Sequence, residues 1–163
     1  MASRPAWVAL VVLISFACDS TSNAAHPSPS ARLYLGSLGS PGCAPIAAFH
    51  NWSEGGFPET GVDSKAGSFW ALIFGPVPPP AGKDVKIVWR MTGSGDFAFY
   101  ATCADGHVIP TLDEPQPHGL NGSNWNHPGY EVGTGFNFPH SGCWDIHVAR
   151  SNVDGDLWLE VAT

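Results

Sequence analysis

The sequence predicts an all-β protein whose folded part is a single immunoglobulin-like β-sandwich of about seven short strands. The 163 residues include 19 Gly and 15 Pro, the two poorest helix formers, and no window of eleven residues shows a helical period free of them. Apolar residues make up 44% of the chain, with seven Trp and nine Phe, which is enough to build a core. Short apolar or alternating runs recur between turn-rich segments, a spacing typical of two-sheet sandwiches.

The strands of this sandwich are visible as hydrophobic patterns within residues 31–163. Ser68–Phe74 is a compact apolar run bounded by glycines, which is typical of a buried strand. Asp84–Met91 places apolar residues at every second position and Lys86 and Arg90 between them, which predicts a strand with one wet face. Further strands are expected at residues 96–103, 107–109, 130–138, 143–150 and 157–161.

Three tryptophans of these strands are expected to face the core. Trp70, Trp89 and Trp144 each lie within an apolar or alternating run, where packing is the commoner role of a large aromatic. In the strand that follows Tyr130, Gly133 and Gly135 suggest a bulge or a close approach of another backbone.

The first thirty residues resemble an export signal followed by a tether. Residues 1–17 combine a basic start with a short apolar run, too short to span a bilayer. Cys18 follows a run that resembles a lipobox, although Ser15 and Phe16 depart from the usual pattern, and we expect it to be lipidated. The alternative is cleavage after Ala24, which would release a secreted protein. Residues 18–30 are polar and rich in Ser and Pro, so we expect a disordered tether.

The charge of the chain argues against two kinds of partner. Seven basic and fourteen acidic residues give a net charge of −7 at neutral pH. Nucleic acid and anionic membrane surfaces both attract positive charge, so neither is an expected partner. The membrane would be contacted through the lipid anchor only.

The chain contains four cysteines, and their pairing is open. In an oxidising compartment one pair is expected if Cys18 is lipidated or removed. A Cys103–Cys143 disulfide is the favoured pairing, because both residues lie at the ends of expected strands that flank the same long loop. The alternatives are a bridge from Cys43 to one of these two cysteines, or no bridge.

The long loop at residues 110–129 is the best candidate for a binding site. Structureless loops of about twenty residues are uncommon in compact domains and are usually functional or mobile. An aromatic residue among Asn and His is typical of sites for carbohydrate or other polar ligands, although one buried Trp could equally fix such a loop. The candidate ligand-binding residues are His118, Asn124, Trp125, His127 and Tyr130.

No sequence motif predicts catalysis or a cofactor, so we expect a protein that is not an enzyme. The chain lacks G-x-S-x-G, H-E-x-x-H, a P-loop and a dinucleotide-binding fingerprint. The segment 152–156 carries oxygen ligands but no closing Glu of an EF-hand, and Asp154-Gly155 favours a hairpin turn. No metal-ligating residue is assigned.

Histidines enriched in the second half of the chain leave one alternative function open. Exported proteins can hold copper or zinc through clustered imidazoles. No two of these histidines are spaced i, i+2 on one strand face, so separate loops would have to converge. The five are His107, His118, His127, His140 and His147.

Several short motifs lie between residues 86 and 144. They are residues 86–95 (KIVWRMTGSG), 123–125 (SNW), 127–129 (HPG), 133–136 (GTGF), 138–139 (FP) and 142–144 (GCW). These motifs resemble those of an uncharacterised family of bacterial exported proteins, mostly lipoproteins, with a small immunoglobulin-like sandwich domain. The resemblance covers residues 68–161, and the block 123–144 is its most specific part. The resemblance implies a sandwich on the outer side of a membrane and no activity.

The function expected from these observations is that of a non-enzymatic binding or interaction module. It would be exported, held by a lipid on Cys18 at the outer face of the bacterial cell membrane, and monomeric. Its partner would be a protein, a cell-envelope component or a small polar ligand. The alternative function is copper or zinc binding and delivery through the distal histidines.

Overall fold

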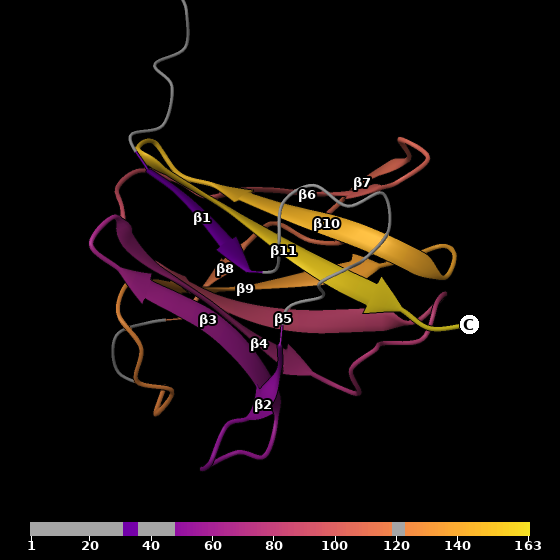
Figure 1. Cartoon of the computed structure of the whole chain (residues 1–163), viewed down its shortest axis with the longest axis horizontal. Helices are drawn as coiled ribbons and strands as arrows, with labels where there is room; N and C mark the ends of the chain where they lie inside the picture. Colours follow the sequence, from indigo (N-terminus) through magenta and orange to yellow (C-terminus); the bar gives the residue numbers. More distant parts are fainter. Residues whose placement is uncertain (1–30, 36–47, 119–122) are drawn as a thin grey trace, which may run out of the picture.

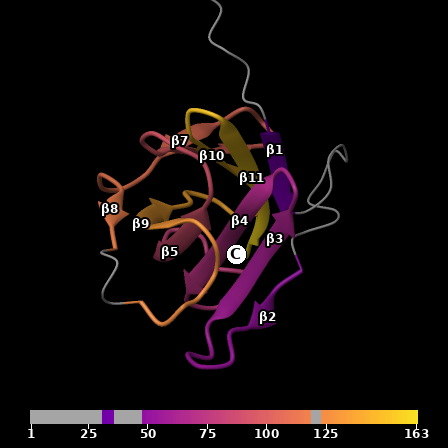
Figure 2. The ribbon, with the colours of Figure 1, turned by 90° about the vertical axis from the view of Figure 1, so that its left-hand side faces the viewer.

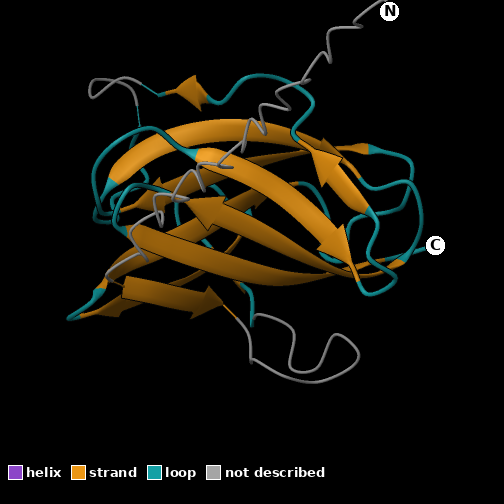
Figure 3. Ribbon diagram, turned by 90° about the horizontal axis from the view of Figure 1, so that it is seen from above, coloured by secondary structure: helices purple, strands orange, loops and turns teal. Residues whose placement is uncertain are grey.

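The computed structural model describes the backbone of residues 31–35 and all atoms of residues 48–118 and 123–163. These residues form two β-sheets that face each other (Figure 1). They contain strands and loops but no helix (Figure 3), and therefore no helix that could cross a membrane. The predicted immunoglobulin-like β-sandwich is confirmed. The predicted signal segment, the tether, Cys18 and Cys43 lie outside the described residues.

The two sheets contain five and six strands. The order in the five-stranded sheet is β1 (Ala31–Leu35), β11 (Val153–Val161), β10 (Gly142–Ala149), β6 (Ala98–Cys103) and β7 (Val108–Pro110). The order in the six-stranded sheet is β2 (His50–Asn51), β3 (Pro58–Ser64), β4 (Gly67–Phe74), β5 (Asp84–Met91), β9 (Tyr130–Asn137) and β8 (Gln116–Pro117). All pairings are antiparallel except β1 with β11.

The main core lies between the sheets and follows the predicted alternation. Trp89 and Trp144 are fully buried, as expected. Trp89 stacks on Phe69 at a centroid distance of 5.7 Å, and its indole Nε1 donates a hydrogen bond of 2.8 Å to Thr134 Oγ1. The indole dipole is therefore satisfied inside the core, which removes the cost of burying an unpaired donor.

Trp70 departs from the prediction, because it lies on the outer face of the six-stranded sheet. Phe69, Ala71 and Ile73 fill the main core, so the alternation of β4 sends Trp70 and Leu72 to the opposite face. A continuous apolar run cannot show which of its two faces meets the larger core. Both faces of β4 are covered, so both could be apolar.

The strand count also exceeds the expected seven. The unpredicted strands are β1, β2, β3 and β8, which are short, polar or at a sheet edge. The turn that joins β10 to β11 lies at residues 151–152, so the predicted turn at Asp154-Gly155 is wrong. Gly155 instead lies within β11, where an added Cβ would come within 2.6 Å of the Phe69 ring from the other sheet. This glycine provides space for packing rather than a turn.

The predicted Cys103–Cys143 disulfide is also wrong, because Cys103 is a free thiol. Cys103 lies directly opposite Trp144 in the β6–β10 register, so both side chains lie on the inner face of the sheet and point toward the core. Cys143 precedes Trp144 by one residue and points to the outer face, opposite the exposed Glu160. Two thiols on opposite faces of one sheet cannot be bridged without moving the backbone. Cys143 is itself disulfide-bonded, and because Cys103 is free, the partner of Cys143 is another cysteine.

Candidate functional site

The candidate site lies on the outer face of the six-stranded sheet. Cross-strand register brings Leu72 of β4 beside Val88 of β5, and both side chains are buried although they face away from the main core. In the neighbouring strand β9, the residue on the outer face beside Val88 is Gly133. The middle of this face is thus an apolar floor formed by Leu72 and Val88, to which β9 contributes no side chain at Gly133.

The segment that precedes β9 runs along the edge of that strand and contains β8. The backbone N–H of Leu112 donates 2.8 Å to Gly135 O, and that of His118 donates 3.2 Å to Glu131 O. An added Cβ on Gly133 would lie 3.1 Å from His118 Nε2, and one on Gly135 would lie 3.3 Å from Leu112 Cδ1. Both glycines are closely approached, but by the side chains of His118 and Leu112 rather than by another backbone as predicted. The two missing side chains make room for the side chains of Leu112 and His118.

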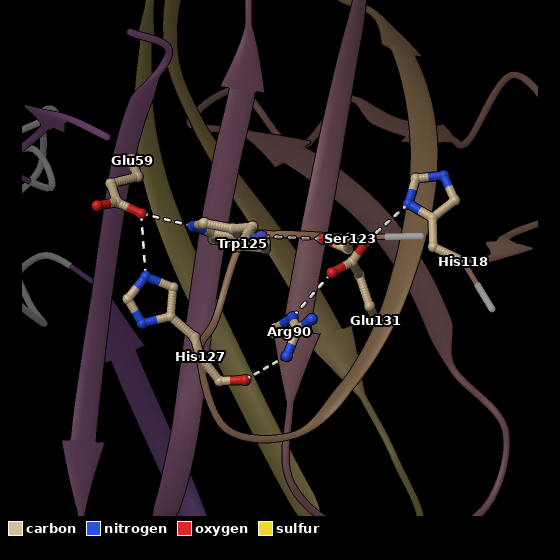
Figure 4. A network of polar contacts seen from close by, with 7 residues as sticks. All are labelled: Glu59, Arg90, His118, Ser123, Trp125, His127 and Glu131. Carbon is tan, nitrogen blue, oxygen red and sulfur yellow. Dashed lines mark hydrogen bonds and ion pairs between the residues drawn. The ribbon is translucent and has the colours of Figure 1, made fainter. Parts of the chain in front are cut away.

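Trp125 fixes the second half of the loop to the same face. Its side chain is 1% exposed and packs on Leu72 and Val88, with Trp52 and Trp70 at the margin of the cluster. Its indole Nε1 donates a hydrogen bond of 2.6 Å to Glu59 Oε2 (Figure 4). The orange segment that leads into β9 runs beside β4 and β5 (Figure 2). This loop is therefore packed onto the sheet by one buried aromatic.

Glu59 is buried and has three polar partners. Besides the Trp125 indole, His127 Nε2 lies 3.0 Å from Glu59 Oε2, and His50 Nε2 lies 3.0 Å from Glu59 Oε1. The His127 ring stacks on Trp70 with a centroid distance of 3.6 Å and an interplanar angle of 10°. Several hydrogen-bond partners offset the desolvation of a buried carboxylate.

Glu131 has an equivalent arrangement on β9. Arg90 Nε donates 2.8 Å to Glu131 Oε2, and His118 Nδ1 lies 3.0 Å from Glu131 Oε1. Arg90 also donates through a terminal guanidinium nitrogen to the backbone carbonyl of His127 (Figure 4). Arg90 thereby links the two buried carboxylates through the loop that covers the sheet. The position of the loop depends on both carboxylates.

A groove lies between this loop and the sheet. It has a volume of about 430 Å³ and combines an apolar floor with polar groups at its edge. Its lining includes Trp52, Phe74, His118, Asn124, Trp125 and Glu131. A neighbouring cavity of about 480 Å³ shares His118, Ser123 and Glu131 with the groove and extends to Arg90 and Tyr130. Apolar surface with a few fixed polar groups is the usual composition of a small-molecule site.

The five residues that the sequence predicted to bind a ligand lie in different parts of this face. Trp125, Asn124 and His118 line the groove, where the Asn124 amide donates 2.9 Å to Glu54 Oε2. Tyr130 lines the neighbouring cavity. His127 is held between Trp70 and Trp125, with the latter edge-on at 5.2 Å. Trp125 is the buried residue that fixes the loop. The sequence allowed this role as the alternative to ligand binding.

The distal histidines are distributed over separate contacts. His118 and His127 pair with different glutamates of the six-stranded sheet, and His147 pairs with Asp156 on the outer face of the five-stranded sheet. The hydrogen bond to Asp156 raises the pKa of His147 above its ordinary value, against the lowering effect of burial. His107 and His140 lie close together, with ring centroids 6.1 Å apart.

Sequence reasoning missed the residues that hold the loop in place. Glu59 lies in β3, which is too polar and irregular to be recognised as a strand. Arg90 was predicted on the wet face of its strand, but its partner Glu131 can be found only from the β5–β9 register. Trp52 and Glu54 come from the turn after β2, far from the loop in sequence.

Comparison of the chain with protein-family models, with curated proteins and with solved structures finds no match in any of the three.

Proposed function

We propose that this protein is a non-enzymatic, exported binding module that takes a small polar ligand with one apolar face in the groove bordered by residues 117–118 and 123–125. The observation that carries this proposal is the groove itself, with its buried floor and its preset polar edge. A sugar ring has the required chemistry, because its C–H face can pack on Trp52 and Phe74 while its hydroxyls reach Asn124 and Glu131.

The fixed orientation of the polar groups supports a preformed binding site. Glu131 is held by Arg90 and His118, and Glu59 by Trp125 and two histidines. Each of these carboxylates is thereby held in one orientation. Such groups suit the fixed acceptors of a binding site.

The location of the protein is part of the proposal and rests on the sequence. Lipidation of Cys18 and the polar segment 18–30 would hold a monomeric sandwich outside the bacterial cell membrane, as the resemblance to exported lipoproteins implies. Cys18→Ala should release the protein from the membrane fraction or leave it as uncut precursor. Wild-type protein that is already soluble and begins at Ala25 would contradict the anchor.

A binding assay tests the groove. We expect the purified protein to bind on a glycan array that includes soluble peptidoglycan fragments, with affinity measured by calorimetry. Asn124→Ala and His118→Ala should each weaken binding by about tenfold, which corresponds to about 1.4 kcal/mol. Asn152→Ala, on the β10–β11 turn, is the matched control and should bind like wild type. Equal binding by all three variants would move the site elsewhere.

A further inference from the structure

A cluster of metal-ligating side chains lies at one end of the five-stranded sheet, away from the groove. It joins the end of β6 and the turn after it to the turn that precedes β10. The thiol of Cys103, a carboxylate oxygen of Asp105 and a ring nitrogen of His140 all lie within 4.8 Å of one another. It is the one such convergence of three His, Cys, Asp or Glu ligand atoms among the described residues.

The turn after β6 holds two of these groups in place. The backbone N–H of His107 donates 2.9 Å to Asp105 Oδ1, which leaves Oδ2 directed toward His140. Hydrogen bonds from Cys103 N to His107 O and from Gly106 N to Cys103 O, both 2.9 Å, close the turn. A preformed turn reduces the ordering cost of binding an ion.

His140 has the orientation that metal-binding histidines have in proteins. Its Nδ1 lies 3.1 Å from the carbonyl oxygen of Ser141, and its Nε2 lies 3.9 Å from Asp105 Oδ2. A carbonyl can only accept, so Nδ1 carries the proton and the lone pair of the neutral ring is on Nε2. A hydrogen bond of this kind from the second ring nitrogen fixes the tautomer of most metal-bound histidines.

Contact with Trp144 also fixes the ring of His140. It lies 5.1 Å from the buried indole of Trp144, whose Nε1 donates 3.2 Å to the His140 carbonyl. The ring of His107 lies 6.1 Å from the rings of both His140 and Trp144. His107 thus borders the cluster.

We propose that Cys103, Asp105 and His140 form a binding site for a zinc-class divalent cation. Sulfur, imidazole nitrogen and carboxylate oxygen are all zinc ligands, with bonds of about 2.0–2.3 Å. Ligand atoms at these bond lengths are separated by about 3.3–3.8 Å in a tetrahedral site, so the cluster needs only a small contraction. Thiolate and imidazole together favour zinc over magnesium or calcium, which prefer oxygen ligands.

Three protein ligands leave one tetrahedral position for water, for His107 or for an exogenous ligand. Asp105 is exposed and Cys103 is partly exposed, so an ion can enter from solvent. The free thiol of Cys103 also has an assigned role here, although an unpaired cysteine is unusual in an exported protein. The proposal is independent of ligand binding in the groove, because it uses none of the same residues.

Cobalt(II) titration of the purified chain tests this proposal, since Co²⁺ bound to a thiolate gives a charge-transfer absorption that reports the Cys103 bond. We expect the band to saturate at one equivalent and to disappear on adding Zn²⁺. Cys103→Ser should abolish the band, and Asp105→Asn and His140→Gln should each weaken Zn²⁺ binding at least about tenfold. Asp113→Asn, an exposed carboxylate elsewhere, is the matched control and should bind like wild type.

Thermal unfolding of the metal-free variants separates loss of binding from loss of the fold. All three ligands lie at the surface end of the sandwich, so we expect melting temperatures within a few degrees of the wild type. Absence of the band in the folded wild-type protein would overturn the proposal. So would a band of equal strength in folded Cys103→Ser.

Discussion

The outer face of the six-stranded sheet and the end of the five-stranded sheet use the same residue types for different purposes. On the outer face, His118 and His127 are each paired with a buried glutamate, and they hold a loop over an apolar floor. At the sheet end, His140 faces an exposed Asp105 and a free Cys103. A histidine that pairs with a buried carboxylate helps to hold the fold together. A histidine that lies beside exposed ligand atoms remains available to bind an ion.

The largest effect on the free energy of unfolding is expected in the main core, outside both of these regions. Trp89→Ala or Trp144→Ala should lower the free energy of unfolding by about 3–5 kcal/mol, because each removes a fully buried aromatic. Denaturant titration measures the change. Trp52→Ala, at the half-buried margin of the outer cluster, should cost much less. A cost below about 1 kcal/mol at Trp89 would mean that the faces of β5 are assigned incorrectly.

The next effect tests whether Trp125 fixes the loop through its indole nitrogen. Trp125→Phe keeps an aromatic ring but removes the donor to Glu59, and should cost about 1.5–3 kcal/mol. We expect faster proteolysis within residues 111–129 while the main core stays folded. Limited proteolysis followed by mass spectrometry locates the cuts. Cuts distributed evenly over the chain would show instead that Trp125 belongs to the global core.

A smaller effect concerns the His147–Asp156 pair. Because the pKa of His147 is raised in the folded state, the protonated pair stabilises the protein fully below the unfolded pKa of about 6.5. That contribution is lost as the pH rises through the folded pKa of His147. Unfolding measured from pH 5 to 9 should show this decline in the wild type. The decline should be absent in His147→Gln, and its persistence there would assign it to another group.

The smallest effect on stability is expected at Cys103. Cys103→Ser should change the free energy of unfolding by about 1 kcal/mol or less, because the thiol lies partly exposed at the rim of the core. Maleimide labelling of the native protein should modify Cys103, and peptide mapping without reduction should join Cys143 to Cys43. A crosslinked peptide that contains both Cys103 and Cys143 would contradict the register of β6 and β10.

The sequence predicted the main core better than it predicted the outer face. Alternating strands such as Asp84–Met91 have one dominant face, so the burial of Trp89 follows from local pattern alone. Trp70 and Leu72 lie in a run that is apolar on both faces, where the pattern does not say which side meets which core. The partners of Arg90 and Trp125 depend on register and on a loop that crosses several strands, and neither is encoded in nearby residues.

The central claim, that the groove on the outer face is the ligand site, is tested most directly by nuclear magnetic resonance with a set of mono- and disaccharides. We predict that binding sugars shift the amide signals of Ser123 and Asn124 and the indole signal of Trp52, while those of the fully buried Trp89 and Trp144 stay unchanged. Shifts confined instead to Phe97 and Arg150, which line another cavity of about 620 Å³, would contradict the claim, as would no shifts at millimolar sugar.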